Sequence, residues 1–75
     1  MNKSELGKKI KARRSELGIT QEDLAELSDT SSKTVREIER GQGNPRFNTI
    51  IAIVAVLGLV LVFASLFTNN DSKES

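Results

Sequence analysis

The sequence predicts an all-α protein of about five short helices, with one C-terminal β-strand that pairs across a dimer. Three observations predict this architecture. Apolar residues recur three and four positions apart as far as Leu57, which is helical periodicity. Polar capping residues and glycines bound these segments where helices are expected to begin and end. A run rich in β-branched and aromatic residues follows Gly58 and has the length of one strand.

The composition is that of one small globular domain. The chain has 75 residues, of which 28% are charged and 37% hydrophobic, and its formal net charge is +1. Chains of this size often gain stability by oligomerising, because a single small core is only marginally stabilising. The net charge is too small to indicate a polyanionic partner by itself. Cys and His do not occur, which excludes disulfides, Cys-based zinc sites, cysteine nucleophiles and histidine general bases.

The first helix is expected to begin at Ser4, its N-cap, and to run to about Leu17. Leu6, Ile10 and Leu17 share one face, and Gly18 ends the helix, whereas residues 1–3 are expected to fray. Basic side chains crowd this helix, at Lys8, Lys9, Lys11, Arg13 and Arg14. Two interpretations stay open for them: a solvated face, or contact with the phosphates of a nucleic acid at one end of the helix.

A second helix is expected to follow at once. Thr20 is a good N-cap for it, and acidic residues fill its first turn, where the helix dipole favours them. Leu24, Ala25 and Leu27 give this helix an apolar face. Residues 28–30 then break the pattern, because short polar side chains compete for helical backbone hydrogen bonds.

A third short helix begins after Ser31, which is its expected N-cap, and stops at Gly41. Val35 and Ile38 stand three apart and face the core, so the polar residues near the start of the helix point outward. A short helix that is pinned by a neighbour and polar on its outer face suits the major groove of DNA.

Three motifs in these two helices resemble one family. They are T-Q-E-D-L-A at residues 20–25, S-x-x-T-V at residues 31–35 and I-E-R-G at residues 38–41. In this order and spacing they resemble the phage-repressor-like helix-turn-helix family of Cro and C1-type regulators, also called the XRE family. The resemblance runs from about Leu6 to Leu59. It implies the helix-turn-helix fold and a dimeric repressor or autoregulator that recognises a palindromic operator in double-stranded DNA.

The resemblance also implies site residues. Those expected to contact bases are Ser32, Lys33, Arg36 and Glu37, and those expected to contact phosphates are Gln21, Ser31, Asn44 and Arg46. The alternative for each of them is an ordinary exposed position without a contact to DNA. Arg14 and Glu39 resemble a structural ion pair between the first and third helices. One departure stands in the turn, where Asp29 and Thr30 occupy positions at which the family usually has Gly and an aliphatic residue.

The apolar run at residues 50–67 has two interpretations. It contains eighteen residues without a charge, which is the lower limit for a transmembrane helix, and Arg46 would then keep the N-terminus inside. Alternatively the run divides at Gly58. The first part is then a helix capped by Asn48 or Thr49, while Phe47 anchors the core ahead of it.

We favour the divided run, because the fold needs a core face, formed by Ile50, Ile53, Val54 and Leu57, that a bilayer would remove. Residues 1–58 then form the DNA-binding domain, residues 59–67 a strand, and residues 68–75 a disordered tail. A lone apolar strand would aggregate unless it paired with that of a second copy. The expected dimer interface consists of Val60, Leu61, Val62, Phe63 and Ala64.

Three functions therefore stay open. The first is a DNA-binding repressor, which forms a homodimer in the cytoplasm. The second is an antitoxin that also binds a toxin protein, because a helix followed by a dimerising strand loosely resembles the HipB-type antitoxins. The third is a membrane-anchored regulator, which ranks behind the others because the divided run is favoured. No enzyme is expected and no cofactor or metal is implied, since no acid, base and nucleophile come together.

Overall fold

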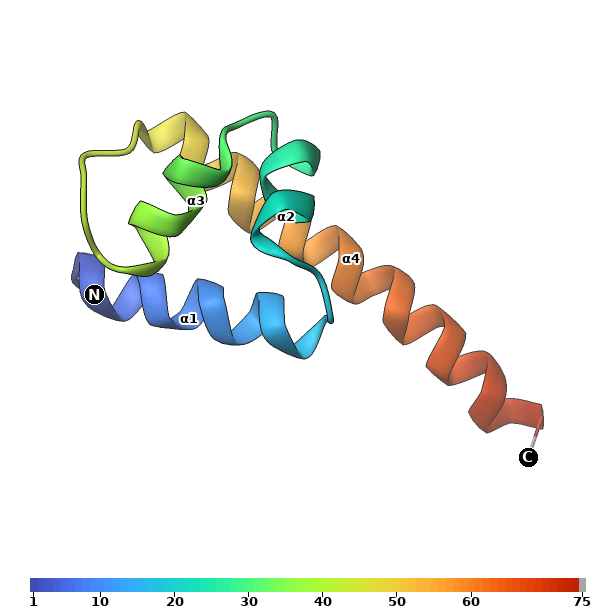
Figure 1. Cartoon of the computed structure of the whole chain (residues 1–75). Coiled ribbons are helices and arrows are strands. Elements are labelled where there is room, and N and C mark those ends of the chain that lie inside the picture. The colour runs from blue at the N-terminus through green and yellow to red at the C-terminus, as the bar shows by residue number, and fades with distance from the viewer. Residues whose placement is uncertain (75) are drawn as a thin grey trace.

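The computed structural model describes the backbone of residues 1–74 and the side chains of residues 1–67. Four helices form this part of the chain: α1 (Lys3–Glu16), α2 (Gln21–Leu27), α3 (Ser32–Glu39) and α4 (Phe47–Glu74). The first three helices and the beginning of α4 pack together, and the rest of α4 projects away from them (Figure 1). The molecule is accordingly elongated, at 46 × 23 × 18 Å. The all-α prediction is confirmed, with four helices where about five were expected.

Each of the first three helices begins with a side-chain cap. Asn2 caps α1, its Oδ1 accepting from the backbone N–H of Glu5 at 2.9 Å, so the expected cap at Ser4 is wrong by two residues. At α2, Thr20 and Asp23 form a reciprocal capping box, with bonds of 2.9 and 3.0 Å. Ser31 caps α3 by accepting from Thr34 N–H at 3.1 Å, as expected.

The same three helices end in the same geometry. The residues just past the helix ends, Gly18, Asp29 and Gly41, all have positive φ, at 72°, 57° and 71°. In each case two backbone N–H groups turn back to carbonyls of the last turn, as Thr30 does to Ala25 at 2.9 Å. Asp29 therefore occupies a glycine position, and Asp is one of the few residues that tolerate it.

The core lies between α2, α3 and the first part of α4. Leu24, Val35 and Ile53 are fully buried, and Ile10, Ala25, Ile38 and Leu57 complete the buried cluster. α1 closes the core from below, and at Gly7 its backbone lies directly against α3. A Cβ at Gly7 would clash with the carbonyl oxygen of Ile38 and approach that of Glu39 to 2.8 Å.

Three residues that the sequence placed in the core are exposed instead: Leu27, Phe47 and Val54. Leu27 is the last residue of α2 and lies about 100° around the helix from Ser28, which is buried in its place. Phe47 is not a core anchor but is 74% exposed. Phe47, Ile51 and Val54 are spaced by four and three residues, so they share the outer side of α4, opposite Ile53.

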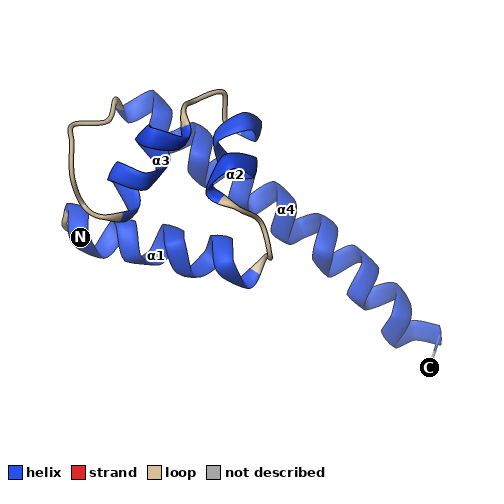
Figure 2. Cartoon of the chain, in the orientation of Figure 1, coloured by secondary structure: helices blue, strands red, loops and turns tan. Residues whose placement is uncertain are grey.

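The predicted C-terminal strand is wrong. α4 continues without a break through Gly58, and residues 59–67 are helical (Figure 2). The physical reason is that a helix satisfies its own backbone hydrogen bonds, whereas a strand needs a partner strand, which this chain does not offer in residues 1–74. The helix propensity lost to Gly and β-branched residues is only about 0.5–1 kcal/mol each. Residues 68–74, which were expected to form a disordered tail, continue α4 as far as Glu74. Ser75 lies outside the described residues.

Candidate nucleic-acid interface

The outer face of α3 carries the side chains expected to contact bases. Because Val35 and Ile38 point into the core, Lys33, Arg36 and Glu37 lie on the opposite side of the helix. Lys33 is exposed, while Ser32, Arg36 and Glu37 are half-buried. The hydroxyl of Ser31 is engaged in the cap, where it also donates to Thr34 Oγ1 at 2.9 Å.

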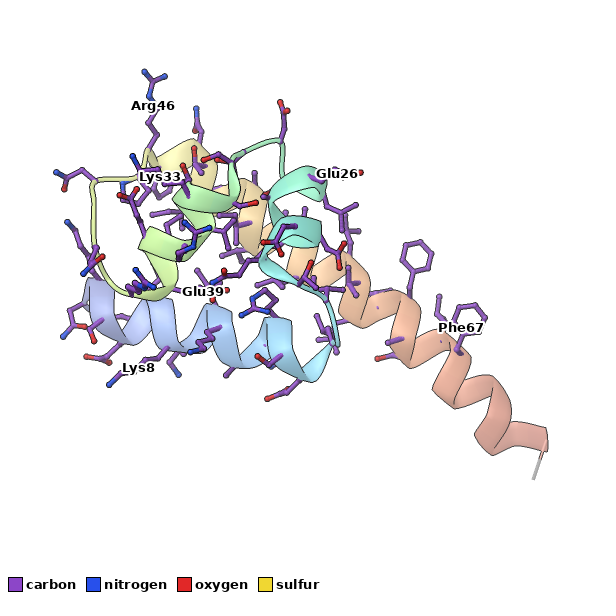
Figure 3. The ribbon with its side chains drawn as sticks, viewed as in Figure 1. Lys8, Glu26, Lys33, Glu39, Arg46 and Phe67 are labelled. Atoms are coloured by element: carbon purple, nitrogen blue, oxygen red, sulfur yellow. The ribbon has the colours of Figure 1, made fainter. Side chains whose placement is uncertain are left out.

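The loop between α3 and α4 lies beside this face. Lys3 holds it in place, its Nζ donating to the carbonyl of Gly43 at 2.8 Å and to Asn44 Oδ1 at 2.9 Å. Arg46 projects from the end of the loop on the same side of the molecule as Lys33 (Figure 3). Sequence reasoning missed Lys3, which it placed in a frayed terminus, because no local signal links a lysine to a loop forty residues away.

The ion pair between Arg14 and Glu39 lies behind this surface. Arg14 Nε donates to Glu39 Oε2 at 2.6 Å and Nη2 donates to Oε1 at 3.0 Å, so the pair is bidentate. A third donor, Nη1, reaches the carbonyl oxygen of Ile19 at 3.0 Å. The side chains are 13% and 2% exposed, which makes the pair an internal link between α1 and α3.

Gln21, expected at a phosphate, is part of the same cluster. Its Nε2 donates to Glu39 Oε1 at 3.0 Å, and the residue is half-buried. The side chain therefore ties the start of α2 to α3. The amide N–H₂ group expected to contact a phosphate is therefore turned toward Glu39.

The electrostatics of the cluster keep it ionised. Burial opposes the charge on Glu39, but the hydrogen bonds from Arg14 and Gln21 and the charges of Arg14 and Lys11 outweigh it and hold the pKa of this carboxyl below its ordinary value. The hydrogen bond to Glu39 in turn raises the pKa of Arg14. A carboxylate held in this way is architectural. No group of three or more His, Cys, Asp or Glu side chains that could hold a metal ion occurs among the described residues.

Lys8 of α1 faces away from the outer face of α3. Lys8 projects from the lower side of α1, whereas Lys33 and Arg46 lie at the opposite side of the molecule (Figure 3). Of the basic residues of α1, Lys3 is the one that contacts the loop beside α3. The structure therefore does not bring Lys8 to the surface formed by α3.

Comparison with known proteins agrees with the geometry of α2 and α3. Residues 10–61 match the family model described as helix-turn-helix. This chain belongs to the XRE-type helix-turn-helix family. The match extends past Gly58 to Leu61, so the first part of α4 belongs to the helix-turn-helix domain.

Two relatives are similar over most of this chain. An uncharacterised HTH-type transcriptional regulator of Haemophilus influenzae is 35% identical over 63 residues, which cover 84% of this chain and 64% of that protein. An immunity repressor protein of Bacillus phage phi105 is 39% identical over 54 residues, covering 72% of this chain and 38% of that protein. The chain therefore spans less than two thirds of the length of either relative.

Proposed function

We propose that this helix-turn-helix protein is a repressor that binds a palindromic operator as a dimer, through the N-terminal half of α3. The observation that carries the proposal is the polar outer face of α3, where Lys33, Arg36 and Glu37 stand together beside the loop that presents Arg46. The repressor named among the relatives supports the direction of regulation.

The side chains suit base edges and phosphates in different ways. Lys33 can donate to O6 and N7 of guanine, and Glu37 can accept from N4 of cytosine. Arg46 is exposed and positioned by a loop that Lys3 holds, so it suits the sugar–phosphate backbone. Asn44 offers its amide N–H₂ group for the same purpose, since its Oδ1 already accepts from Lys3.

The dimer is part of the proposal because α3 is short. A helix of eight residues contacts too few base pairs to single out one site in a genome. Two copies related by a twofold axis would contact half-sites about 34 Å apart. The strand interface expected at residues 60–64 is not part of this proposal, because those residues are helical.

A matched pair of lysine variants tests the base contacts. Lys33→Ala should weaken operator binding by about 1–3 kcal/mol and relax the preference at one base pair. Lys8→Ala removes the same charge from the opposite side of the molecule and should leave operator affinity nearly unchanged. Binding of both variants to the operator and to single-base-pair substitutions of it gives the comparison. If Lys33→Ala kept the full preference, α3 would not be the helix that contacts bases.

A second experiment tests the palindrome. The wild-type chain should bind a two-half-site DNA much more tightly than an isolated half-site, and moving the half-sites by half a helical turn should abolish the advantage. Equal affinity for both DNAs would contradict the dimer while leaving the contacts of α3 in place.

A further inference from the structure

The part of α4 beyond the buried core is apolar on all of its sides. In residues 58–67 the one polar side chain is Ser65, and none is charged. Successive residues turn about 100° around a helix, so ten residues surround the axis completely. Leu59, Phe63 and Phe67 are 60%, 62% and 72% exposed. A partner helix would cover one stripe of this segment, whereas a helix that is apolar all round belongs in a core or in lipid.

The outer side of the first part of α4 continues this apolar surface. Phe47, Ile51 and Val54 are exposed there. Among the described residues, one stretch, Phe47–Phe67, is long and apolar enough to cross a membrane. Its mean hydropathy is 3.1, and 11% of its 18-residue apolar window is buried. Ile53 and Leu57 are nonetheless buried in the helix-turn-helix core, so a complete span would empty that core.

Cations border the apolar surface on the side of α1. A groove of about 230 Å³ separates the two helices, with Lys9 and Arg13 on the α1 wall and Val54, Leu57 and Leu61 on the α4 wall. α1 carries six basic and two acidic side chains, the acids being Glu5 and Glu16.

In the part of the chain that is described, two ion pairs involve the basic side chains of α1, those of Arg13 and Arg14. Arg13 pairs with Glu16 at 3.5 Å, and both of these side chains are largely exposed. Within residues 1–67 no ion pair is described for Lys8 or Lys9. An apolar helix beside exposed lysines has the chemistry of a surface that binds anionic lipid.

This surface and the DNA-binding surface lie on different sides of the molecule. In Figure 3 Lys8 is below α1 and Phe67 is on the projecting part of α4, whereas Lys33 and Arg46 are at the top. The two surfaces therefore do not compete for the same ligand.

We propose that the α1–α4 surface, formed by residues 58–67 of α4 and by Lys8 and Lys9 of α1, docks on a bilayer that contains anionic lipid. The apolar side chains of α4 enter the acyl region, and Lys8 and Lys9 lie at the headgroups. The first part of α4 stays in the core, so the bound protein keeps its fold and its DNA-binding face. The sequence alone ranked a membrane role low because a spanning helix would remove the core face of residues 50–57. Docking by residues 58–67 avoids this objection, because Ile53 and Leu57 stay in the core.

Flotation of the full chain with vesicles in detergent-free buffer tests the proposal. The chain should float with vesicles of phosphatidylcholine and phosphatidylglycerol, and much less with phosphatidylcholine alone or at high salt. Replacing Lys8 and Lys9 together by Glu should lower vesicle affinity by roughly tenfold or more. Phe63→Gln combined with Leu66→Gln should abolish flotation. Lys33→Ala is the control and should float like the wild type, which also separates this proposal from the DNA contacts.

Three outcomes would overturn the proposal. A stable dimer that ignores both kinds of vesicle would show that a second copy covers α4. Equal, carbonate-resistant insertion into both kinds of vesicle, unaffected by the lysine changes, would show that α4 spans the bilayer. Loss of DNA binding by the vesicle-bound chain would show that α4 leaves the core. Vesicle-bound protein that still retains a DNA duplex supports the docked arrangement.

Discussion

Residues 47–57 and 59–67 of α4 are both largely apolar, but only the first segment contributes buried residues to the core. Before Gly58, Ile53 and Leu57 are buried against the other helices, and Ile50 and Val56 pack beside them. After Gly58, Leu59, Phe63 and their neighbours are exposed. What differs is the presence of α1, α2 and α3, which lie against the first part alone (Figure 1). An apolar sequence therefore indicates that a segment is to be buried, but the packing of the other helices determines which of its residues are buried within this chain.

The largest effect should come from the pair that holds the covering helices together. Arg14→Met leaves Glu39 buried without its partner and should destabilise the domain by about 3–5 kcal/mol. A thermal melt measures this loss. Near wild-type stability would mean that the pair behaves as a surface ion pair, worth about 1 kcal/mol or less.

A matched pair of truncations compares the two parts of α4 directly. Ile53→Ala should destabilise the domain by about 2–5 kcal/mol, because it leaves a cavity in a fully packed site. Val62→Ala, at a half-exposed position beyond the core, should change stability by about 0.5 kcal/mol or less. Urea unfolding of both variants in lipid-free buffer measures the difference. Similar losses at both positions would show that the second part of α4 is covered in solution.

Acid should weaken the domain without changing α4 itself. The pKa of Glu39 is below its ordinary value in the folded chain, so its contribution is present above the unfolded-state pKa and is lost as pH falls through the folded pKa. Protonation removes the charge of Glu39 but leaves both side chains packed in place, so the loss of stability should be smaller than that from Arg14→Met. Melts between neutral and acidic pH should show this slope in the wild type and less of it in Glu39→Gln.

A small effect of the opposite sign is expected at the end of α2. Asp29→Gly should stabilise the domain by about 0.5–1 kcal/mol, because glycine adopts φ of 57° without strain. Gly18→Ala is the matched variant at the end of α1, where an added Cβ meets no atom within 4 Å. It should lower the stability of the domain by a similar amount, because alanine is strained at the positive φ of this position. Chemical unfolding of both variants should show a higher free energy of unfolding for Asp29→Gly and a lower one for Gly18→Ala.

Local signals accounted for most of the domain. Thr20 and Ser31 as caps, and Gly18 and Gly41 as helix ends, depend on neighbouring residues alone, so the sequence was sufficient for them. The cap of α1 was misplaced because Asn2 and Ser4 are both competent residues.

Apart from the Arg14–Glu39 pair, which the resemblance implied, long-range contacts escaped sequence reasoning. The roles of Gly7 and Lys3 depend on where α3 and its loop pass in space. At residues 59–67 the β-branched composition favoured a strand, but without a partner strand the helical continuation of α4 is the stable backbone. In the candidate site, the outward positions of α3 followed from periodicity, whereas the inward turn of Gln21 depends on the buried charge of Glu39.

The contact at Gly7 has a mechanical meaning. Because the backbones of α1 and α3 touch there, no deformable layer of side chains separates the two helices. Arg14, about two turns further along α1, bonds the side chain of Glu39 at the same end of α3. These two contacts join α1 directly to the end of α3. In the proposed membrane-docked state, a tilt of α1 on the bilayer would therefore be passed on to α3.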